Sequence, residues 1–375
     1  MEIFKYLRPP DNNPWIDPVY RRDFSRVALV CRFFCSVMLP WIYESMGFAG
    51  KNSNGSFDIN HAPFCRSIIR GCESARTMAT YVKRCSFSDW IHDEYDSTPS
   101  WYNTEFQALY SRALAFMPNV EELELKRIHI NKYLLKGLME LKNLRSLSLD
   151  FCRIWEVKTK EIRKLSTLQL EHLRFFGSSK ISVNDETLLI SQFLRLDSLL
   201  TLHTNYWPLA ARIAVQNCHL PLQELEIFEA RDVGLLPKIF QKTPALNMLR
   251  ITSAATSEHH VQFDDILPAL DVLCCPLFLL RSLVPGRPIS SIEITDSTLA
   301  KNTDIQSLFK KSTCKIRSLC VPIHVYQTNP FWEHFPDLKS LRLESEGTLR
   351  NYLCPLTEQS LKKVFANIFL HRILI

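Results

Sequence analysis

The chain has 375 residues, of which 46% are hydrophobic and 22% charged, a composition typical of a globular protein and not of a disordered one. This length is sufficient for two domains or for one extended repeat domain. The formal net charge is +6, but the lysines and arginines are spread along the chain without a dense basic block. We therefore expect no nucleic-acid partner.

Targeting signals and cysteine usage indicate the compartment. The first residues contain no long apolar run, so we expect no secretory signal. The most apolar stretch, 267–280, is too short to cross a membrane and is interrupted by two prolines and an aspartate, so we expect no membrane partner. Of the twelve cysteines, several occupy apolar periodic positions, namely Cys31, Cys35, Cys85 and Cys275. This pattern favours reduced, buried thiols in a cytoplasmic or nuclear protein.

The N-terminal region is predicted to be helical. Four prolines between residues 8 and 19 indicate a loop, because proline disfavours helix at and before its own position. Apolar residues then recur at three- and four-residue steps, which predicts one amphipathic helix over 20–38. The residues of this stripe are Phe24, Val27, Ala28, Cys31, Phe34, Cys35 and Met38. A further short helical element is expected from Leu39-Pro40 onward.

Three of these segments, 2–7, 27–34 and 39–43, resemble the F-box, and in particular that of many basidiomycete proteins. The resemblance implies a three-helix module at 1–48 that binds the Skp adaptor of a cullin–RING ubiquitin ligase. The family's opening Leu-Pro-x-Glu segment is absent, so the module is expected to be truncated at its start. The implied adaptor contacts are Ile3, Phe4, Leu7, Val27, Val30, Cys31, Phe34, Leu39 and Pro40. The alternative is that these residues only form a helical cap on the next domain.

The rest of the chain repeats the pattern apolar-x-x-apolar-x-apolar. The central apolar residues lie at positions 123, 147, 173, 199, 225, 249, 273, 292, 319 and 341, which are between 19 and 27 residues apart. The copy centred on Leu199 is weaker, and an earlier strand is possible around Cys85. This period is typical of leucine-rich repeats, here similar to the irregular kind found with F-boxes because the usual Asn after the strand is missing. The segment 283–289 also resembles one common in those fungal proteins, or is a plain turn.

The expected fold is α/β: a short helical module followed by a curved leucine-rich-repeat solenoid with a parallel sheet inside and helices outside. One repeat buries too few side chains to offset its own ordering entropy, so neighbouring repeats must stack. Helices are expected at 133–141, 187–194 and 235–240. We expect a linker and cap helix at 49–80, the solenoid at 81–356 and a C-terminal capping helix at 357–375.

Motifs that carry chemistry are not apparent. None of the nine glycines forms a phosphate-binding loop, and there is no Gly-x-Ser-x-Gly sequence. The pairs Cys31/Cys35 and Cys274/Cys275 are expected to pack in the core, since neither has partners at zinc-ligand spacing. His259 and His260 are adjacent and so would not point at one metal. We expect no catalytic residues, no metal, no cofactor and no enzymatic activity. A Cys/His site would have to form in space, and no spacing favours it.

A binding surface is predicted where strand residues alternate with the buried leucines. The predicted substrate-binding residues on this concave face are Glu122, Glu124, His172, Arg174, Glu224, Glu226, Met248 and Arg250, with Met248 or Phe228 as apolar anchors. Their mixed charge suits a protein partner, although a merely solvated sheet face is the alternative. The acidic and aromatic loop at 89–102 is expected to be a packed cap or a second partner contact.

These features predict an adaptor that binds Skp, and through it a cullin, and holds an unidentified protein substrate for ubiquitination. The alternative is a leucine-rich-repeat interaction scaffold with no link to a ubiquitin ligase. An enzyme is the third reading, which a cluster of titratable side chains in one pocket would favour.

Overall fold

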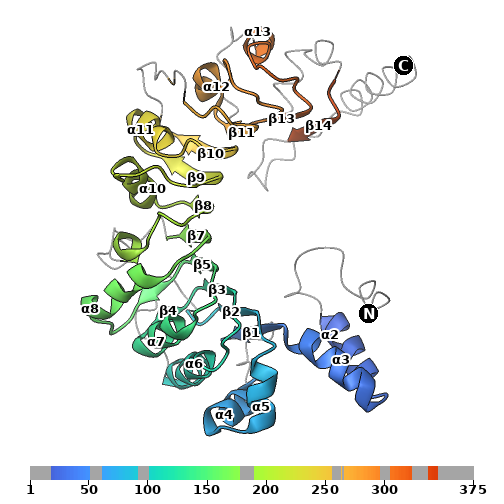
Figure 1. Ribbon diagram of the computed structural model, residues 1–375. Coiled ribbons are helices and arrows are strands. Elements are labelled where there is room, and N and C mark those ends of the chain that lie inside the picture. The colour runs from blue at the N-terminus through green and yellow to red at the C-terminus, as the bar shows by residue number, and fades with distance from the viewer. Residues whose placement is uncertain are drawn as a thin grey trace, which may run out of the picture.

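The computed structural model describes residues 18–50, 61–91, 101–177, 190–255, 263, 266–295, 305–322 and 337–344. Within them the chain forms one twelve-stranded sheet, in which every strand pairs in parallel with its neighbours along the chain. Figure 1 shows the strands lining the inner side of an arc, with helices on its outer side. This is the α/β solenoid expected from the repeats.

The strands of the large sheet are β1 (Ser45–Ala49), β2 (Arg84–Ser88), β3 (Glu122–Lys126), β5 (Ser146–Asp150), β7 (His172–Phe176), β8 (Thr201–Thr204), β9 (Glu224–Ala230), β10 (Met248–Ala254), β11 (Val272–Cys275), β12 (Ser291–Ile294), β13 (Ser318–Pro322) and β14 (Ser340–Glu344). A second, two-stranded sheet is formed by β4 (His129–Ile130) and β6 (Arg153–Ile154).

The helices are α2 (Pro18–Ala28), α3 (Arg32–Tyr43), α4 (Ala62–Arg70), α5 (Glu73–Ala79), α6 (Trp101–Leu114), α7 (Lys132–Glu140), α8 (Thr159–Ile162), α10 (Trp207–Ala214), α11 (Leu236–Gln241), α12 (Leu277–Leu283) and α13 (Ile305–Phe309). There are also two 3₁₀ helices. The first, η1 (Arg163–Thr167), follows α8, and the second, η2 (Val233–Leu235), precedes α11.

The register of the sheet confirms most of the predicted strand centres. Leu123, Leu147 and Leu173 are paired side by side on β3, β5 and β7. The same row continues through the centres at 225, 249, 273, 292, 319 and 341, and extends back to Cys85 on β2. Apart from Leu341, which is partly buried, the members of this row are almost completely buried, so the row forms the spine of the hydrophobic core.

The weak copy centred on Leu199 is wrong by three residues. Leu202, not Leu199, pairs with Leu173 and Leu225. Leu196, Leu199 and Leu202 are spaced by three, so the pattern fits in two registers. The structure selects the later one even though it places a threonine, Thr204, at a buried position. The Thr204 hydroxyl is satisfied there, because it donates to the Phe175 carbonyl at 2.9 Å and accepts from the Tyr206 amide at 2.9 Å.

Helices on the outer side follow the prediction where the structure describes them. The helix expected at 133–141 is α7, which begins after Asn131, whose side chain accepts from the amides of Tyr133 and Leu134. The helix expected at 235–240 is η2 followed by α11. Residues 190–193 of the third are helical, and 187–189 lie outside the described residues. Gly137 allows α7 to approach α6, because a Cβ there would lie 2.6 Å from the Ser111 carbonyl oxygen.

The N-terminal helix predicted over 20–38 is broken. The chain reverses at 29–31 between α2 and α3, and Cys31 is extended at φ −162°. Phe24 of α2 meets Trp41 of α3 edge to face, with ring centroids 6.0 Å apart, so two short helices bury their apolar stripes against each other. The apolar period runs through the break, which is why the sequence pattern missed it. Cys31 is exposed and not in the core, contrary to expectation.

Strand β1 was not predicted at all, since 39–48 was expected to be helical. Its Phe48 packs against Phe87 and stacks on Tyr110, with ring centroids 4.9 and 4.8 Å apart, and so closes the N-terminal end of the core. The expected capping helix at 357–375 lies outside the described residues.

The segment 283–289 contains both a turn and a buried arginine. Gly286 has φ +74°, a conformation that favours glycine. Arg287 is buried and donates to five backbone carbonyls, those of Phe263, Ile266, Ser282, Leu283 and Pro285. It therefore joins the end of α12 to the segment before β11.

Candidate functional site

The inner face of the sheet is built from the strand residues that alternate with the buried leucine spine. Its central row consists of the residues that follow each spine residue, and the register aligns Glu124, Ser148, Arg174, His203, Glu226, Arg250, Cys274, Glu293, Cys320 and Arg342 across ten consecutive strands. Because side chains in one row of a parallel sheet are neighbours, charges that are far apart in sequence meet here.

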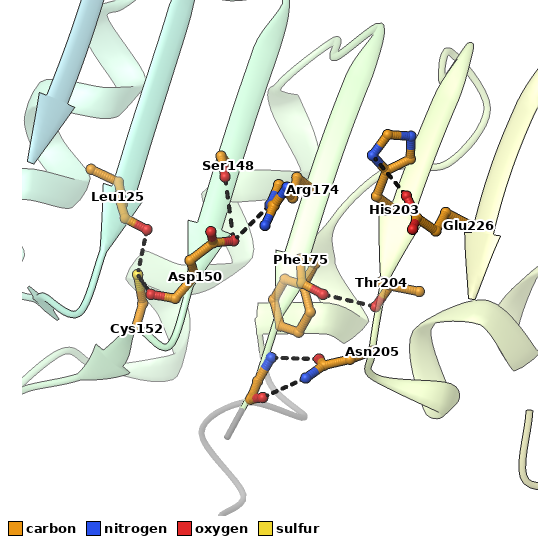
Figure 2. Close-up of polar contacts among 11 residues, drawn as sticks. Leu125, Ser148, Asp150, Cys152, Arg174, Phe175, His203, Thr204, Asn205 and Glu226 are labelled. Carbon is orange, nitrogen blue, oxygen red and sulfur yellow. Dashed lines mark hydrogen bonds and ion pairs between the residues drawn. The ribbon is translucent and has the colours of Figure 1, made fainter. Parts of the chain in front are cut away.

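One polar cluster lies on β5 and β7. Asp150, although only 6% exposed, accepts from the Arg174 Nε at 3.2 Å and from the Ser148 hydroxyl at 3.4 Å. Figure 2 shows the Arg174 side chain turned toward Asp150. The Arg174 guanidinium also lies over the ring of Phe176, 4.4 Å from its centroid. The sequence prediction included Arg174 but missed Asp150, which lies at the end of its strand.

A hollow opens beside this cluster, across β3, β5 and β7. It is called the β3–β7 hollow below and is lined by Glu122, Leu123, Glu124, Lys126, Ser146, Ser148, Asp150 and Arg174. Burial, followed by the nearby Asp150 carboxylate, raises the pKa of Glu124. Among the described residues, the Glu124 carboxylate has no hydrogen bond or ion pair, whereas Asp150 has two donors.

A second ionic cluster extends from β8 to β14. His203 Nδ1 lies 3.5 Å from Glu226 Oε2 (Figure 2), and Arg250 Nε lies 3.9 Å from Glu226 Oε1. Arg250 reaches across β11 to Glu293 with two parallel contacts of 3.2 Å. Glu293 also accepts from Arg342 at 3.1 Å. These bidentate and shared pairs tie four repeats together.

His203 is the first member of the second cluster, and the sequence prediction missed it because the predicted strand register was shifted there. Its Nε2 is 4.0 Å from Glu224, in addition to the contact with Glu226. Burial lowers the pKa of His203, and the two carboxylates oppose this effect. The imidazole is therefore held mainly neutral at pH 7.

Apolar side chains interrupt the charged row. Phe228 on β9 is 37% exposed and meets Phe176 edge to face, with ring centroids 4.9 Å apart. Together these two rings are called the Phe176–Phe228 ledge. Cys274 and Cys320 are buried within the row, and burial raises the pKa of the Cys274 thiol. Cys275 is packed in the core as predicted, whereas Cys274 is buried on the inner face between Arg250 and Glu293.

The eight residues predicted to bind a substrate all lie on β3, β7, β9 or β10. Several of their charges are already paired within the chain, as the contacts of Arg174, Glu226 and Arg250 show. His172 contacts Thr201 at 3.1 Å, and Met248 is half-buried. The clusters leave Glu122, Glu124 and the ledge as the groups most open to a partner. Their role as a binding site stays a prediction.

The described part of the acidic and aromatic loop is packed. Trp90 is buried, and its indole N–H donates to the Phe48 carbonyl at 2.9 Å. Asp89 pairs with Arg127 at 3.6 Å on the surface. Residues 92–100 of the loop lie outside the described residues.

The residues predicted to bind the Skp adaptor are divided by the structure. Ile3, Phe4 and Leu7 lie outside the described residues. Val27, Phe34, Leu39 and Pro40 are half-buried in the α2–α3 hairpin, whereas Val30 and Cys31 are exposed at its turn. The turn also exposes Leu29 and Phe33, at 86% and 66%, and Val30 at 69%. These three apolar residues, Leu29, Val30 and Phe33, are called the hairpin tip below.

The described residues contain neither a metal-binding cluster nor a membrane-spanning helix. Within the described ranges, no group of three or more His, Cys, Asp or Glu side chains converges in a way that would hold a metal ion. His259 and His260 lie outside those ranges. No helix in the described part of the chain is both long and apolar enough to cross a membrane.

Comparisons with known proteins give only distant likenesses. No protein-family model matches the chain, and no curated protein matches it. Among solved structures, an internalin from Listeria monocytogenes is similar at 13% identity and a TM-score of 0.35, covering 77% of this chain and 96% of the other. A leucine-rich-repeat protein of Leptospira interrogans is similar at 12% identity and a TM-score of 0.30, covering 82% of this chain and 80% of the other. The fold assignment therefore rests on the repeat period and strand register of the chain itself.

Proposed function

We propose that this chain is a leucine-rich-repeat scaffold whose inner sheet face binds a protein partner. The observation that supports the proposal is the inner face from β3 to β14, on which a row of paired charges lies beside the Phe176–Phe228 ledge on one parallel sheet. Ion pairs within the chain hold the side chains in place, and such preorganisation lowers the entropy lost on binding. Mixed charge gives a partner its register, and the exposed Phe228 supplies apolar contact area.

The test uses proximity labelling in cells. The variant with Glu224→Lys and Phe228→Ala changes two groups on the inner face without breaking the Arg250–Glu293 pair. Arg250→Glu is avoided because it would leave Glu226 and Glu293 without their shared cation. Glu140→Lys, an exposed residue of α7 on the outer side, is the matched control.

We expect the inner-face variant to lose labelled partners that the control retains. If the folded inner-face variant keeps every partner of the wild type, the inner face is not the binding surface. In that case the outer helices become the candidate.

A finer function is the adaptor role in a cullin–RING ubiquitin ligase, acting in the cytoplasm or nucleus. The observation in its favour is the hairpin tip, where three large apolar side chains are exposed next to each other on the α2–α3 turn. Exposed apolar groups that cluster in this way mark interaction sites. The F-box resemblance assigns Val30 and Cys31 of this turn to the Skp contact. In this role the chain binds and positions partners and has no catalytic activity of its own.

Calorimetric titration of the full chain with purified Skp adaptor tests this finer proposal. Binding should be abolished by the Val30→Asp, Phe33→Asp variant and retained by Arg22→Glu, an exposed substitution on α2 of the same hairpin. If the wild-type chain does not bind the adaptor, the ligase role is excluded and the scaffold function remains. Turnover by the purified chain alone, in a screen of hydrolase and transferase substrates, would contradict the absence of catalytic activity.

A further inference from the structure

The β3–β7 hollow carries an unbalanced charge. Its three carboxylates, on Glu122, Glu124 and Asp150, face two cationic side chains, those of Lys126 and Arg174. Arg174 is committed to Asp150 at 3.2 Å and at the same time stacks on Phe176. Lys126 is exposed at the rim and forms no ion pair among the described residues. The hollow therefore holds one more negative charge than its own side chains neutralise.

The carboxylate that keeps this unneutralised negative charge is that of Glu124. It lies directly beside Ser148 in the central row, and that hydroxyl already donates to Asp150. The Glu124 carboxylate is half-buried and, within the described residues, has neither a hydrogen bond nor an ion pair. Burial and the charge of Asp150 raise its pKa, and the smaller opposing effects of Lys126 and Arg174 do not cancel this shift. A carboxylate held in this way is less stable in the folded chain at neutral pH than in water, and an incoming cation would offset that cost.

The nature of the cation follows from the shape of the site. The described acids do not converge into a group that could hold a metal ion. The hollow is open, is formed by three strands and contains a single uncommitted half-buried carboxylate, so it suits one ammonium or guanidinium group on a flexible stem. Lysine and arginine side chains have that form.

The Phe176–Phe228 ledge adjoins the hollow through Arg174, which lines the hollow and lies over Phe176. The two rings are in contact above β8, and Phe228 is the more exposed of the two. With strands about 4.8 Å apart, the centre of the hollow at β5 lies two strands, or roughly 10 Å, from the ledge above β8. An extended segment, at about 3.3 Å per residue, covers this distance in roughly three residues.

We propose that this part of the inner face, from β3 to β9, binds a segment of the protein partner that places a lysine or arginine side chain in the β3–β7 hollow and a large apolar side chain on the Phe176–Phe228 ledge. The inference rests on the proposed scaffold function and names the chemistry of its partner. Glu124 selects the cation, and Phe228 supplies the apolar contact.

Panning a phage library of random twelve-residue peptides on the full chain tests this specificity. Enriched peptides should carry a basic residue about three positions from a large apolar residue. For a synthesised peptide from this set, measured by fluorescence anisotropy, Glu124→Gln should weaken binding about tenfold and Phe228→Ala at least fivefold. The matched controls are Glu140→Gln and Phe116→Ala, both exposed residues outside the inner face, and they should leave binding unchanged.

Folding is monitored in the same variants. Because the pKa of Glu124 is raised in the folded chain, its ionisation destabilises the fold as pH rises above the unfolded value of 4.5. Glu124→Gln should therefore be at least as stable as the wild type at pH 7, so that lost binding cannot be attributed to unfolding.

The inference is overturned if enriched peptides are acidic or uncharged, if Glu124→Gln binds them as well as the wild type, or if no peptide is enriched more on the wild type than on that variant. If peptides without a basic residue bind and are lost in the Glu224→Lys, Phe228→Ala variant, the inference fails while the scaffold function stands. If inner-face variants change neither peptide binding nor the cellular partners, both fail.

Discussion

Replacing Leu202 by alanine tests the register of the sheet at the repeat where the sequence pattern fits in two registers. In the structure Leu202 is completely buried on β8, between Leu173 and Leu225. In the register predicted from the sequence, Leu199 and Thr201 point into the core and Leu202 falls on the solvated inner face. The two registers therefore give opposite expectations for one substitution.

The expected magnitude follows from the burial of Leu202. Truncation to alanine removes about three methylene-sized groups from the core, or roughly 2.4 kcal/mol at 0.8 kcal/mol each. The cavity that remains adds to this loss, and buried leucines replaced by alanine generally cost about 2–5 kcal/mol. Thr201→Ala is the matched control, because Thr201 is half-buried on the inner face and contacts only His172 through its hydroxyl. Its loss should be within about 1 kcal/mol.

The assay is guanidinium denaturation followed by circular dichroism. A lower midpoint with an unchanged slope would show that stability and not the extent of unfolding has changed. If Leu202→Ala is as mild as Thr201→Ala, or if Thr201→Ala is the more damaging of the two, the register of β8 described here is refuted.

Three further predictions concern the core, the inner face and the turn after α12. Leu147→Ala should lower the free energy of unfolding by about 2–5 kcal/mol and Ser146→Ala by less than about 0.5 kcal/mol, since Leu147 is buried and Ser146 lies on the inner face. Equal losses of stability in denaturation would contradict the strand assignment of β5. The pKa of His203 is lowered on folding, so its contribution to stability is present above the unfolded value of 6.5 and is lost as pH falls below it. His203→Gln should therefore flatten the dependence of the unfolding free energy on pH below 6.5. An unchanged slope would argue against a lowered pKa of His203 in the folded chain. Arg287→Lys should lower stability by more than about 3 kcal/mol, because one ammonium cannot donate to five carbonyls. If the variant instead unfolds near the wild-type temperature in a thermal scan, water replaces the lost hydrogen bonds and the prediction is wrong.

The sequence alone was sufficient for the repeat architecture, although not for the N-terminal module. The buried row through Leu123, Leu147, Leu225 and Leu249 is visible in the linear pattern, because each strand alternates faces and each repeat returns after a similar number of residues. Helix α7 was equally predictable, since its period and its Asn131 cap are local features. The residues that face the inner side follow from the same alternation, which is why the eight predicted there lie on that sheet.

Tertiary structure decided the features that depend on neighbours distant in the chain. Leucines spaced by three at 196, 199 and 202 permit two registers, and only pairing with β7 and β9 selects Leu202. The reversal at 29–31 arises because α2 and α3 bury more by packing on each other than one long helix would bury alone. The charges on the inner face show the same dependence most clearly. Arg250 and Glu293 are 43 residues apart, and Asp150 and Arg174 are 24 apart, yet each pair is joined across strands. Which carboxylate stays uncommitted is therefore a property of the sheet, because charge neutralisation depends on distance in space and not on order in the chain.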